Sequence, residues 1–178
     1  MKKIFLFIFI VLSLQAYSQN DYLVTLNGIG NLKLDMKLSE VEKMLGKKFT
    51  LKNVDYKEGS WMDTVKTKYK NTDMILYFER QYEDDVKFNM VLAGMQVSNP
   101  LFKTNTGIGI GADKMKIITT YEMSRLSVMP DYTDDTYMTL SKTLSTIWVY
   151  NDDSENTLVF HLKNKKVVSI ELMRFYGD

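Results

Sequence analysis

The side chains able to perform nucleophilic or acid–base catalysis are few in this sequence. His161 is the single histidine, and the chain has no cysteine. A serine nucleophile would therefore need His161 as its base, but no serine stands in a Gly-x-Ser-x-Gly turn. Phe160 and Leu162 flank the histidine in a segment that alternates as strands do. We interpret His161 as a strand residue on a polar face, and the same counts argue against a zinc site with histidine or cysteine ligands.

Three acidic clusters are a second source of chemistry. They are Glu83–Asp85, Asp131 with Asp134 and Asp135, and Asp152–Asp153 with Glu155. Paired carboxylates hydrolyse glycosidic bonds when an apolar pocket raises the pKa of one of them, whereas these clusters lie in polar stretches typical of turns. Calcium at Asn151–Asn156 would use the same oxygen ligands, but the spacing differs from that of the twelve-residue calcium loop. A carboxylate-based hydrolase is the third functional hypothesis, and no metal site is predicted.

The stretch Gly107-Ile-Gly-Ile-Gly111 has the glycine spacing of a loose dinucleotide-binding fingerprint. This fingerprint is meaningful only where a strand ends and a helix begins. Ile108 and Ile110 alternate with the glycines as the residues of a strand do. The glycines therefore indicate close packing, and we predict no cofactor.

Aromatic residues make up 12% of the chain and are the best candidates for a binding surface. Exposed aromatic side chains are frequent anchors of protein interfaces, although packing in the core is expected to use more than half of those present. The candidates for contact with a partner protein are Trp61, Tyr69, Tyr77, Tyr132, Tyr137, Trp148 and Tyr150.

Several short periodic segments must position these side chains. Asn27-Gly28 predicts a hairpin that pairs Tyr22–Leu26 with Ile29–Leu34. Helices are predicted over about Leu38–Leu45, ended by Gly46, and from a capping Asp113 to about Ser124. A bulge, or burial on both faces, is expected near Met90-Val91, and a loop from Pro130 to Thr136. The predicted strands are Phe49–Val54, Met62–Tyr69, Met74–Arg80, Val86–Val97, Tyr137–Leu140, Ser145–Tyr150, Thr157–Leu162 and Val167–Met173.

Residues 1–18 match a secretory signal peptide. Lys2 and Lys3 precede an apolar run from Ile4 to Leu12, and Ala16 and Ser18 form a small-x-small end. The run is shorter than the roughly 20 residues that span a membrane. We therefore predict cleavage after Ser18, no membrane anchor after cleavage, and a periplasmic or secreted protein of a Gram-negative type bacterium. Without cysteine, a lipid anchor at the processed end is excluded.

The charge balance and the absence of cysteine limit the kind of partner and the source of stability. The chain has 23 basic and 22 acidic residues and a formal net charge of +1. Such a balance gives no electrostatic reason to expect nucleic acid or an anionic membrane as partner. No disulfide supports the fold in the oxidising compartment that export implies, so stability must come from the core, which 45% hydrophobic residues can supply.

Two stretches share one order of strand, turn and amphipathic helix. They are Gly30–Gly46 and Gly107–Glu122, and aligning Leu34 with Ile110 also matches Leu32 with Ile108, Val41 with Ile117 and Leu45 with Tyr121. We therefore predict an α+β fold of two tandem repeats, residues 19–100 and 101–178. In each repeat a helix is followed by antiparallel strands, and the helices pack on one face of the sheets.

The repeated unit resembles an element, Ile-x-Leu-Gly-Met-Ser-x-x-Glu-Val-x-x-Leu-Leu-Gly, of the β-lactamase inhibitory protein family and of small outer-membrane assembly proteins of related fold. The first copy matches it at Leu32, Leu34, Met36, Glu40, Val41, Met44, Leu45 and Gly46. Asp35 replaces its glycine and Lys37 its capping serine, whereas the second copy has Gly111 and Asp113 but ends at Glu122. In the inhibitor family, the resemblance implies a concave sheet surface that grips a partner protein; no binding residue is carried over.

From these observations we predict an exported, non-enzymatic protein-binding module that is an inhibitor or immunity-like protein. The alternative hypothesis is an accessory protein of envelope assembly. In both cases the expected partner is another protein.

Overall fold

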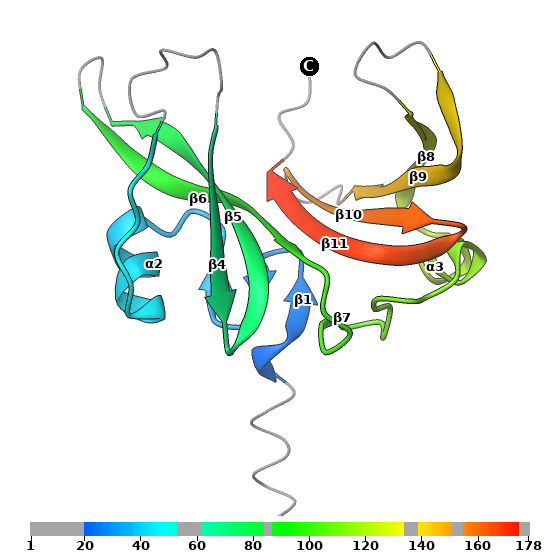
Figure 1. Cartoon of the computed structure of the whole chain (residues 1–178), viewed down its shortest axis with the longest axis horizontal. Helices are drawn as coiled ribbons and strands as arrows, with labels where there is room; N and C mark the ends of the chain where they lie inside the picture. Colours follow the sequence, from blue (N-terminus) through cyan, green and yellow to red (C-terminus); the bar gives the residue numbers. More distant parts are fainter. Residues whose placement is uncertain (1–19, 53–61, 84–86, 134–138, 151–154, 175–178) are drawn as a thin grey trace, which may run out of the picture.

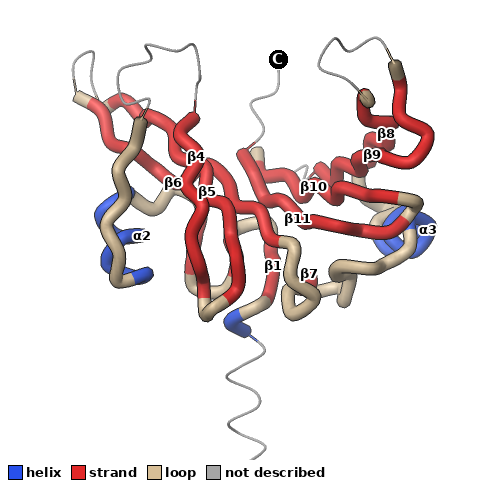
Figure 2. The backbone as a smooth tube through the Cα atoms, in the orientation of Figure 1, coloured by secondary structure: helices blue, strands red, loops and turns tan. Residues whose placement is uncertain are grey.

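The computed structural model describes residues 20–52, 62–83, 87–133, 139–150 and 155–174. Within these ranges, 57% of the residues are in strands and 13% are helical. The strands form two sheets, and Figure 2 shows how few turns of helix accompany them. The prediction of antiparallel sheet is therefore confirmed, but the protein is β-rich.

The larger sheet has seven strands in the order β4-β5-β6-β11-β10-β9-β8, and all of its pairings are antiparallel. β6 and β11 pair from Ile170 with Val97 to Met173 with Gly94, so strands from both halves of the chain form one continuous sheet. The sheet is strongly curved, and its concave face opens upward in Figure 1. The strands are β4 Met62–Tyr69, β5 Thr72–Tyr82, β6 Phe88–Val97, β8 Arg125–Tyr132, β9 Leu140–Tyr150, β10 Asn156–Lys163 and β11 Lys166–Arg174.

The smaller sheet has four short strands in the order β3-β2-β1-β7. Their bounds are β1 Leu23–Thr25, β2 Gly28–Ile29, β3 Leu32–Lys33 and β7 Lys103–Thr104. β1 and β2 form a hairpin near the predicted turn, but its loop is Leu26-Asn27, because Thr25 is opposite Gly28. The predicted second strand Ile29–Leu34 is divided, and β3 turns back to pair with β2. β7 pairs with β1 in parallel. This sheet lies on the convex side of the larger one, where α2 (Leu38–Leu45) and α3 (Lys114–Thr120) also lie (Figure 1).

The core lies between the two sheets. Val24, Ile29, Leu32, Phe102 and Ile108 from the smaller sheet and its connections are fully buried. They belong to one apolar cluster with the alternate residues of the large sheet that face them, Met74, Leu76, Phe78, Met95, Leu158, Phe160, Ile170 and Leu172. Burying a large apolar side chain stabilises a fold by about 1.5–3 kcal/mol, so this cluster supplies the stability that no disulfide provides.

The predicted α+β class, with helices packed on the sheets, is wrong. α2 has eight residues and α3 has seven, which is about two turns each. Each contributes one buried apolar side chain to the core, Val41 and Ile117 respectively. Helices this short cannot cover a sheet of seven strands, so the smaller sheet and its connections take that place. The division into residues 19–100 and 101–178 stays a prediction.

Single elements agree with the sequence predictions to different degrees. The helix predicted over about Leu38–Leu45 is confirmed, with Gly46 at φ 63° as its left-handed cap. A register shift opposite Tyr77 and Phe78 confirms the expected bulge in β6. Residues 49–52 are not a strand, and the loop expected from Pro130 begins inside β8. Pro130 is tolerated there because β8 is an edge strand, where one side of the backbone needs no donor.

Candidate binding face

The concave face of the larger sheet carries its side chains in rows that run across the strands. Because neighbouring residues of a strand point to opposite faces, the pairing register decides which residues share a row. The first row is Ile75, Gln96, Glu171, Val159, Trp148 and Ser127, the second is Tyr77, Gly94, Met173, Thr157, Tyr150 and Arg125, and the third contains Ser169, His161, Thr146 and Met129. We call the surface defined by these three rows the concave face.

A hydrogen-bonded chain joins three strands at the centre of the concave face. The Tyr77 hydroxyl donates to Gln96 Oε1 over 3.3 Å, and Gln96 Nε2 donates to Ser169 Oγ over 3.2 Å. Burial, and to a smaller extent the negative charge of Glu171, raises the pKa of Tyr77 to about 12. Tyr77 therefore stays a neutral hydrogen-bond donor throughout the physiological pH range.

His161 and Glu171 form the second polar pair of this face. His161 Nε2 lies 2.8 Å from Glu171 Oε2, and the two side chains are 31% and 13% exposed. His161 lies in β10, so its predicted place in a strand is confirmed. Ser169 is directly opposite His161, but β10 and β11 are paired on both sides. Strands that are paired on both sides use most of their backbone N–H groups in the ladders, whereas an acyl-transfer site needs free donors for its oxyanion.

An aromatic and cationic cluster lies at the β8 and β9 side of the face. The rings of Trp148 and Tyr150 are stacked with their centroids 6.4 Å apart and an interplanar angle of 16°. Arg125 is directly opposite Tyr150 in the pairing of β8 with β9. Its guanidinium carbon lies 4.4 Å from the centroid of the Tyr150 ring, a cation–π geometry. We call Trp148, Tyr150 and Arg125 the aromatic–arginine cluster.

The seven aromatic candidates are distributed over several parts of the structure. Tyr77, Trp148 and Tyr150 share the concave face and are partly exposed. Tyr132 is 45% exposed in β8, opposite Leu140. Tyr69 is 3% exposed in the core, where its hydroxyl accepts a hydrogen bond from the Asn31 backbone N–H, so it is not part of a binding surface. Trp61 and Tyr137 lie outside the described residues.

Sequence reasoning did not single out Arg125, Gln96, Ser169 or Glu171. Alternation along β11 indicates that Ser169, Glu171 and Met173 share a face, and the same holds for Gln96 within β6. No signal in the sequence pairs β6 with β11, which are far apart along the chain. Only the pairing register of β6 with β11 shows that Gln96 and Glu171 lie in the same row.

The acidic clusters are largely outside the described residues. Of the members that are described, Glu83 forms an exposed ion pair with Lys37, Asp131 accepts a hydrogen bond from the Thr146 hydroxyl, and Glu155 is exposed. Within the described ranges, no three histidine, aspartate or glutamate side chains are grouped so as to hold a metal ion. The hydrolase hypothesis therefore stays a prediction.

The glycine-spaced stretch before α3 is also a structural feature. Gly107 and Gly111 have φ values of 78° and 85°, which glycine adopts without strain. Asp113 caps α3 as predicted, since its carboxylate accepts the Met115 backbone N–H over 2.9 Å. This hydrogen bond holds the pKa of Asp113 below its usual value. A phosphate at this helix start would meet that carboxylate. Close packing accounts for Gly109, where an added Cβ would lie 2.9 Å from the Phe102 carbonyl oxygen, whereas an added Cβ at Gly107 or Gly111 would meet nothing within 4 Å, so there the positive φ accounts for the glycine.

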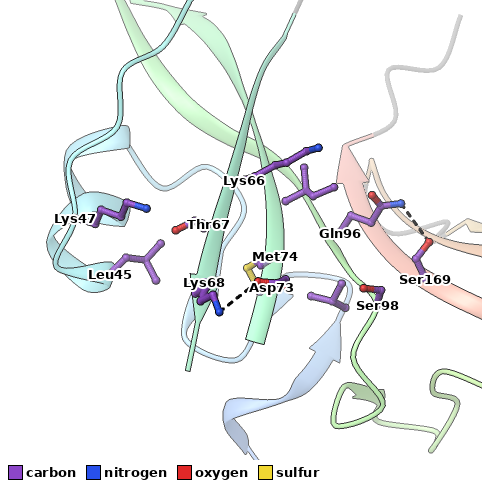
Figure 3. A pocket seen from close by; sticks show the side chains of 12 residues that line it. Leu45, Lys47, Lys66, Thr67, Lys68, Asp73, Met74, Gln96, Ser98 and Ser169 are labelled. Atoms are coloured by element: carbon purple, nitrogen blue, oxygen red, sulfur yellow. Dashed lines mark hydrogen bonds and ion pairs between the residues drawn. The ribbon is translucent and has the colours of Figure 1, made fainter. Parts of the chain in front are cut away.

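A hollow of about 680 Å³ lies at the β4 edge of the large sheet (Figure 3). Its lining includes Lys66 and Lys68 on one face of β4 and Thr67 on the other, because successive residues of a strand point in opposite directions. The hollow is thus an open groove around a sheet edge. Gln96 and Ser169, joined by a dashed line in Figure 3, connect it with the centre of the concave face.

No protein-family model, curated protein or solved structure matches this chain. The resemblance of Gly30–Gly46 to the inhibitor family therefore stays a prediction. Over the ranges that the structure describes, no helix has the length and apolar character needed to cross a membrane.

Proposed function

We propose that this chain is an exported, non-enzymatic module that binds another protein with its concave face, as an inhibitor or immunity-like protein. The observation that carries the proposal is that Tyr77, Trp148 and Tyr150 share adjacent rows of one curved sheet surface. Tryptophan, tyrosine and arginine are the residues most enriched among interface hot spots. A curved sheet presents them toward a common centre, which suits a convex partner.

The side chains of this face are held in place before any partner arrives. Tyr77, Gln96 and Ser169 are joined by hydrogen bonds, His161 bonds to Glu171, and the Arg125 guanidinium lies over the Tyr150 ring. Ordering a flexible side chain on binding costs about 0.5–1.5 kcal/mol. Since these side chains are already ordered on a rigid sheet, most of that cost is avoided, and this supports a role in recognition.

The proposal is tested by affinity capture from periplasmic extract, followed by mass spectrometry. The bait is the purified protein, compared with the double variant Trp148→Ala/Tyr150→Ala and with Met123→Ala. Met123 is 93% exposed after α3 and serves as the matched control. We expect a partner that the unchanged protein and the control retain, and that the double variant retains at least about tenfold less, as expected for hot-spot residues.

The identity of the captured partner separates the two binding hypotheses. A single toxin or enzyme supports the inhibitor role, whereas components of outer-membrane assembly support the accessory role. Failure of the double substitution to reduce capture would contradict the proposed face. Export is checked separately by sequencing the N-terminus of the protein from the same fraction, where cleavage after Ser18 predicts a first residue of Gln19.

A further inference from the structure

Arg125 is held differently from Lys68, Glu171 and Asp131, three other charged residues on the same side of the sheet. Lys68 Nζ lies 3.8 Å from Asp73 Oδ1, Glu171 bonds to His161, and Asp131 accepts from Thr146. Within the described part of the chain, Arg125 forms no ion pair. Its guanidinium lies over the Tyr150 ring instead. A cation on the proposed binding surface is therefore held by an aromatic ring and not by a carboxylate.

The contact with Tyr150 leaves hydrogen-bond donors of Arg125 available. A guanidinium has five N–H donors, and all of them lie in its plane. The side chain is exposed, and its guanidinium carbon lies over the Tyr150 ring. An exposed guanidinium held at a ring can form two parallel N–H···O bonds to one carboxylate, the arrangement that favours arginine over lysine.

The surroundings of Arg125 favour a carboxylate over a more highly charged group. β8 has the sequence Arg-Leu-Ser-Val-Met-Pro-Asp-Tyr and so contains one basic residue and one acidic residue. Polyanions and phosphate backbones are bound by several cations together, and this strand offers a single one. Trp148, stacked beside Tyr150, supplies apolar surface next to the charge.

We propose that the aromatic–arginine cluster is the anchor of the concave face and that it binds an aspartate or glutamate side chain of the partner protein, flanked by an apolar residue. This inference rests on the proposed function, because it names the chemistry of the partner at that face. The carboxylate bonds to the in-plane donors of Arg125, and the flanking residue packs against Trp148. Fixed orientation of all three side chains before binding lowers the entropic cost of the contact.

The test uses random twelve-residue peptides displayed on phage and selected on the immobilised, purified protein. Peptides that also bind Trp148→Ala/Tyr150→Ala are removed, and the affinities of the remaining ones are measured by biolayer interferometry. Aspartate or glutamate is expected at one fixed position next to an apolar residue. Arg125→Gln should weaken these peptides at least about tenfold, the range of a charge-assisted hydrogen bond. Arg125→Lys should also weaken them, because lysine lacks the planar fork.

The control is Lys116→Gln, which removes an exposed positive charge from α3 and should leave peptide affinity unchanged. Equal thermal unfolding of all variants shows that they are folded. Peptides that need Trp148 and Tyr150 but contain no acidic position overturn this inference, as do peptides that bind Arg125→Gln equally well. In either case the proposed function of the concave face as a protein-binding surface would still stand. Recovery of no peptide that depends on Trp148 and Tyr150 overturns the inference and the proposed function together.

Discussion

Gly94 of β6 lies directly opposite Tyr77 of β5, and the Tyr77 ring occupies the space where a side chain of residue 94 would be. A Cβ built on Gly94 would lie 3.1 Å from Tyr77 Cδ2 and 3.1 Å from the Leu172 carbonyl oxygen. Both distances are shorter than ordinary van der Waals contact. The missing side chain therefore lets the ring lie across the sheet, from which its hydroxyl reaches Gln96.

Gly94→Ala should destabilise the protein by about 1–3 kcal/mol, the usual cost of overpacking. The Leu172 oxygen belongs to the backbone and cannot rotate away, so the strands or the Tyr77 ring must shift. Urea unfolding measures the loss. In a double-mutant cycle, Gly94→Ala should cost less in the Tyr77→Ala background, where the ring is absent. Equal costs in both backgrounds would show that the ring does not occupy this space.

Tyr77 should lose its proton at a higher pH than an exposed tyrosine does. Its pKa in the folded state is raised from 10.0 to about 12, first by burial and then by Glu171. The native state therefore holds this proton more tightly than the unfolded chain does. The corresponding stability is complete below pH 10 and is lost as pH rises toward 12, by about 1–2 kcal/mol once solvent screening is allowed for. Tyr77→Phe should remove this part of the pH dependence.

The measurement is the tyrosinate absorbance of the unchanged protein minus that of Tyr77→Phe. The subtraction is needed because burial also raises the pKa of Tyr69. Glu171→Gln is the matched variant, since it removes the nearby charge but keeps the size of the side chain. It should lower the pKa of Tyr77 by less than half of the total shift, because burial is the larger cause. A midpoint near pH 10 for Tyr77 would contradict the buried position.

The sequence contains enough local information for many elements of this fold. The Asn27-Gly28 signal locates a hairpin, although Gly28 pairs with Thr25 and the loop is Leu26-Asn27. The apolar spacing between Leu38 and Leu45 locates α2. β4 was predicted with its observed bounds because Lys66 and Lys68 alternate with Val65, Thr67 and Tyr69. Each of these elements is determined by residues that are close together in the sequence, so periodicity and turn residues are enough to predict it.

The binding face depends instead on pairings between distant residues. The contact of β6 with β11 brings Gln96 next to Glu171, and no turn or periodicity encodes that neighbourhood. β8 was missed for a related reason, because Pro130 and Asp131 are typical of loops. They are accepted in β8 because it lies at the edge of the sheet. The predicted α+β class was wrong because two turns of amphipathic pattern indicate that a helix exists. They do not indicate how much of a sheet that helix covers.

Lys37 occupies the N-cap position of α2, and replacing it with serine should stabilise the protein. Its backbone is already extended, at φ −61° and ψ 148°, and its N–H donates to Glu40 Oε2 over 2.8 Å. An ammonium group cannot accept the N–H groups of the first turn, whereas a serine hydroxyl can. The ion pair lost with Glu83 is exposed, with Nζ 3.6 Å from the carboxylate, and such pairs contribute little.

The expected gain for Lys37→Ser is about 0.5–1 kcal/mol in urea unfolding. Lys37→Ala removes the same charge without supplying an acceptor and should give no gain. If both variants have the same stability, the cap is not the limiting feature of α2.

Arg174, near the end of β11, ties the last strand to two parts of the first half of the chain. Its Nη1 lies 2.8 Å from Glu79 Oε1 of β5, and the two side chains are 13% and 12% exposed. A second ion pair joins its other terminal nitrogen to Asp35, which is 56% exposed. A buried charge is stable only when an opposite charge compensates for its lost hydration. Removal of the buried Glu79 carboxylate should therefore destabilise the fold far more than removal of the exposed Asp35 carboxylate.

Glu79→Ala should therefore destabilise the protein by about 2–4 kcal/mol, since it leaves a largely buried guanidinium without its buried carboxylate. Glu79→Gln keeps a hydrogen-bond acceptor and should cost less. Asp35→Asn should cost under about 1 kcal/mol, as exposed pairs do, and asparagine suits the left-handed backbone of residue 35, at φ 67°. Urea unfolding of the three variants gives the order. An equal loss for Asp35→Asn and Glu79→Ala would mean that burial does not decide the strength of these pairs, and that the tie between β11 and β5 is no stronger than a surface contact.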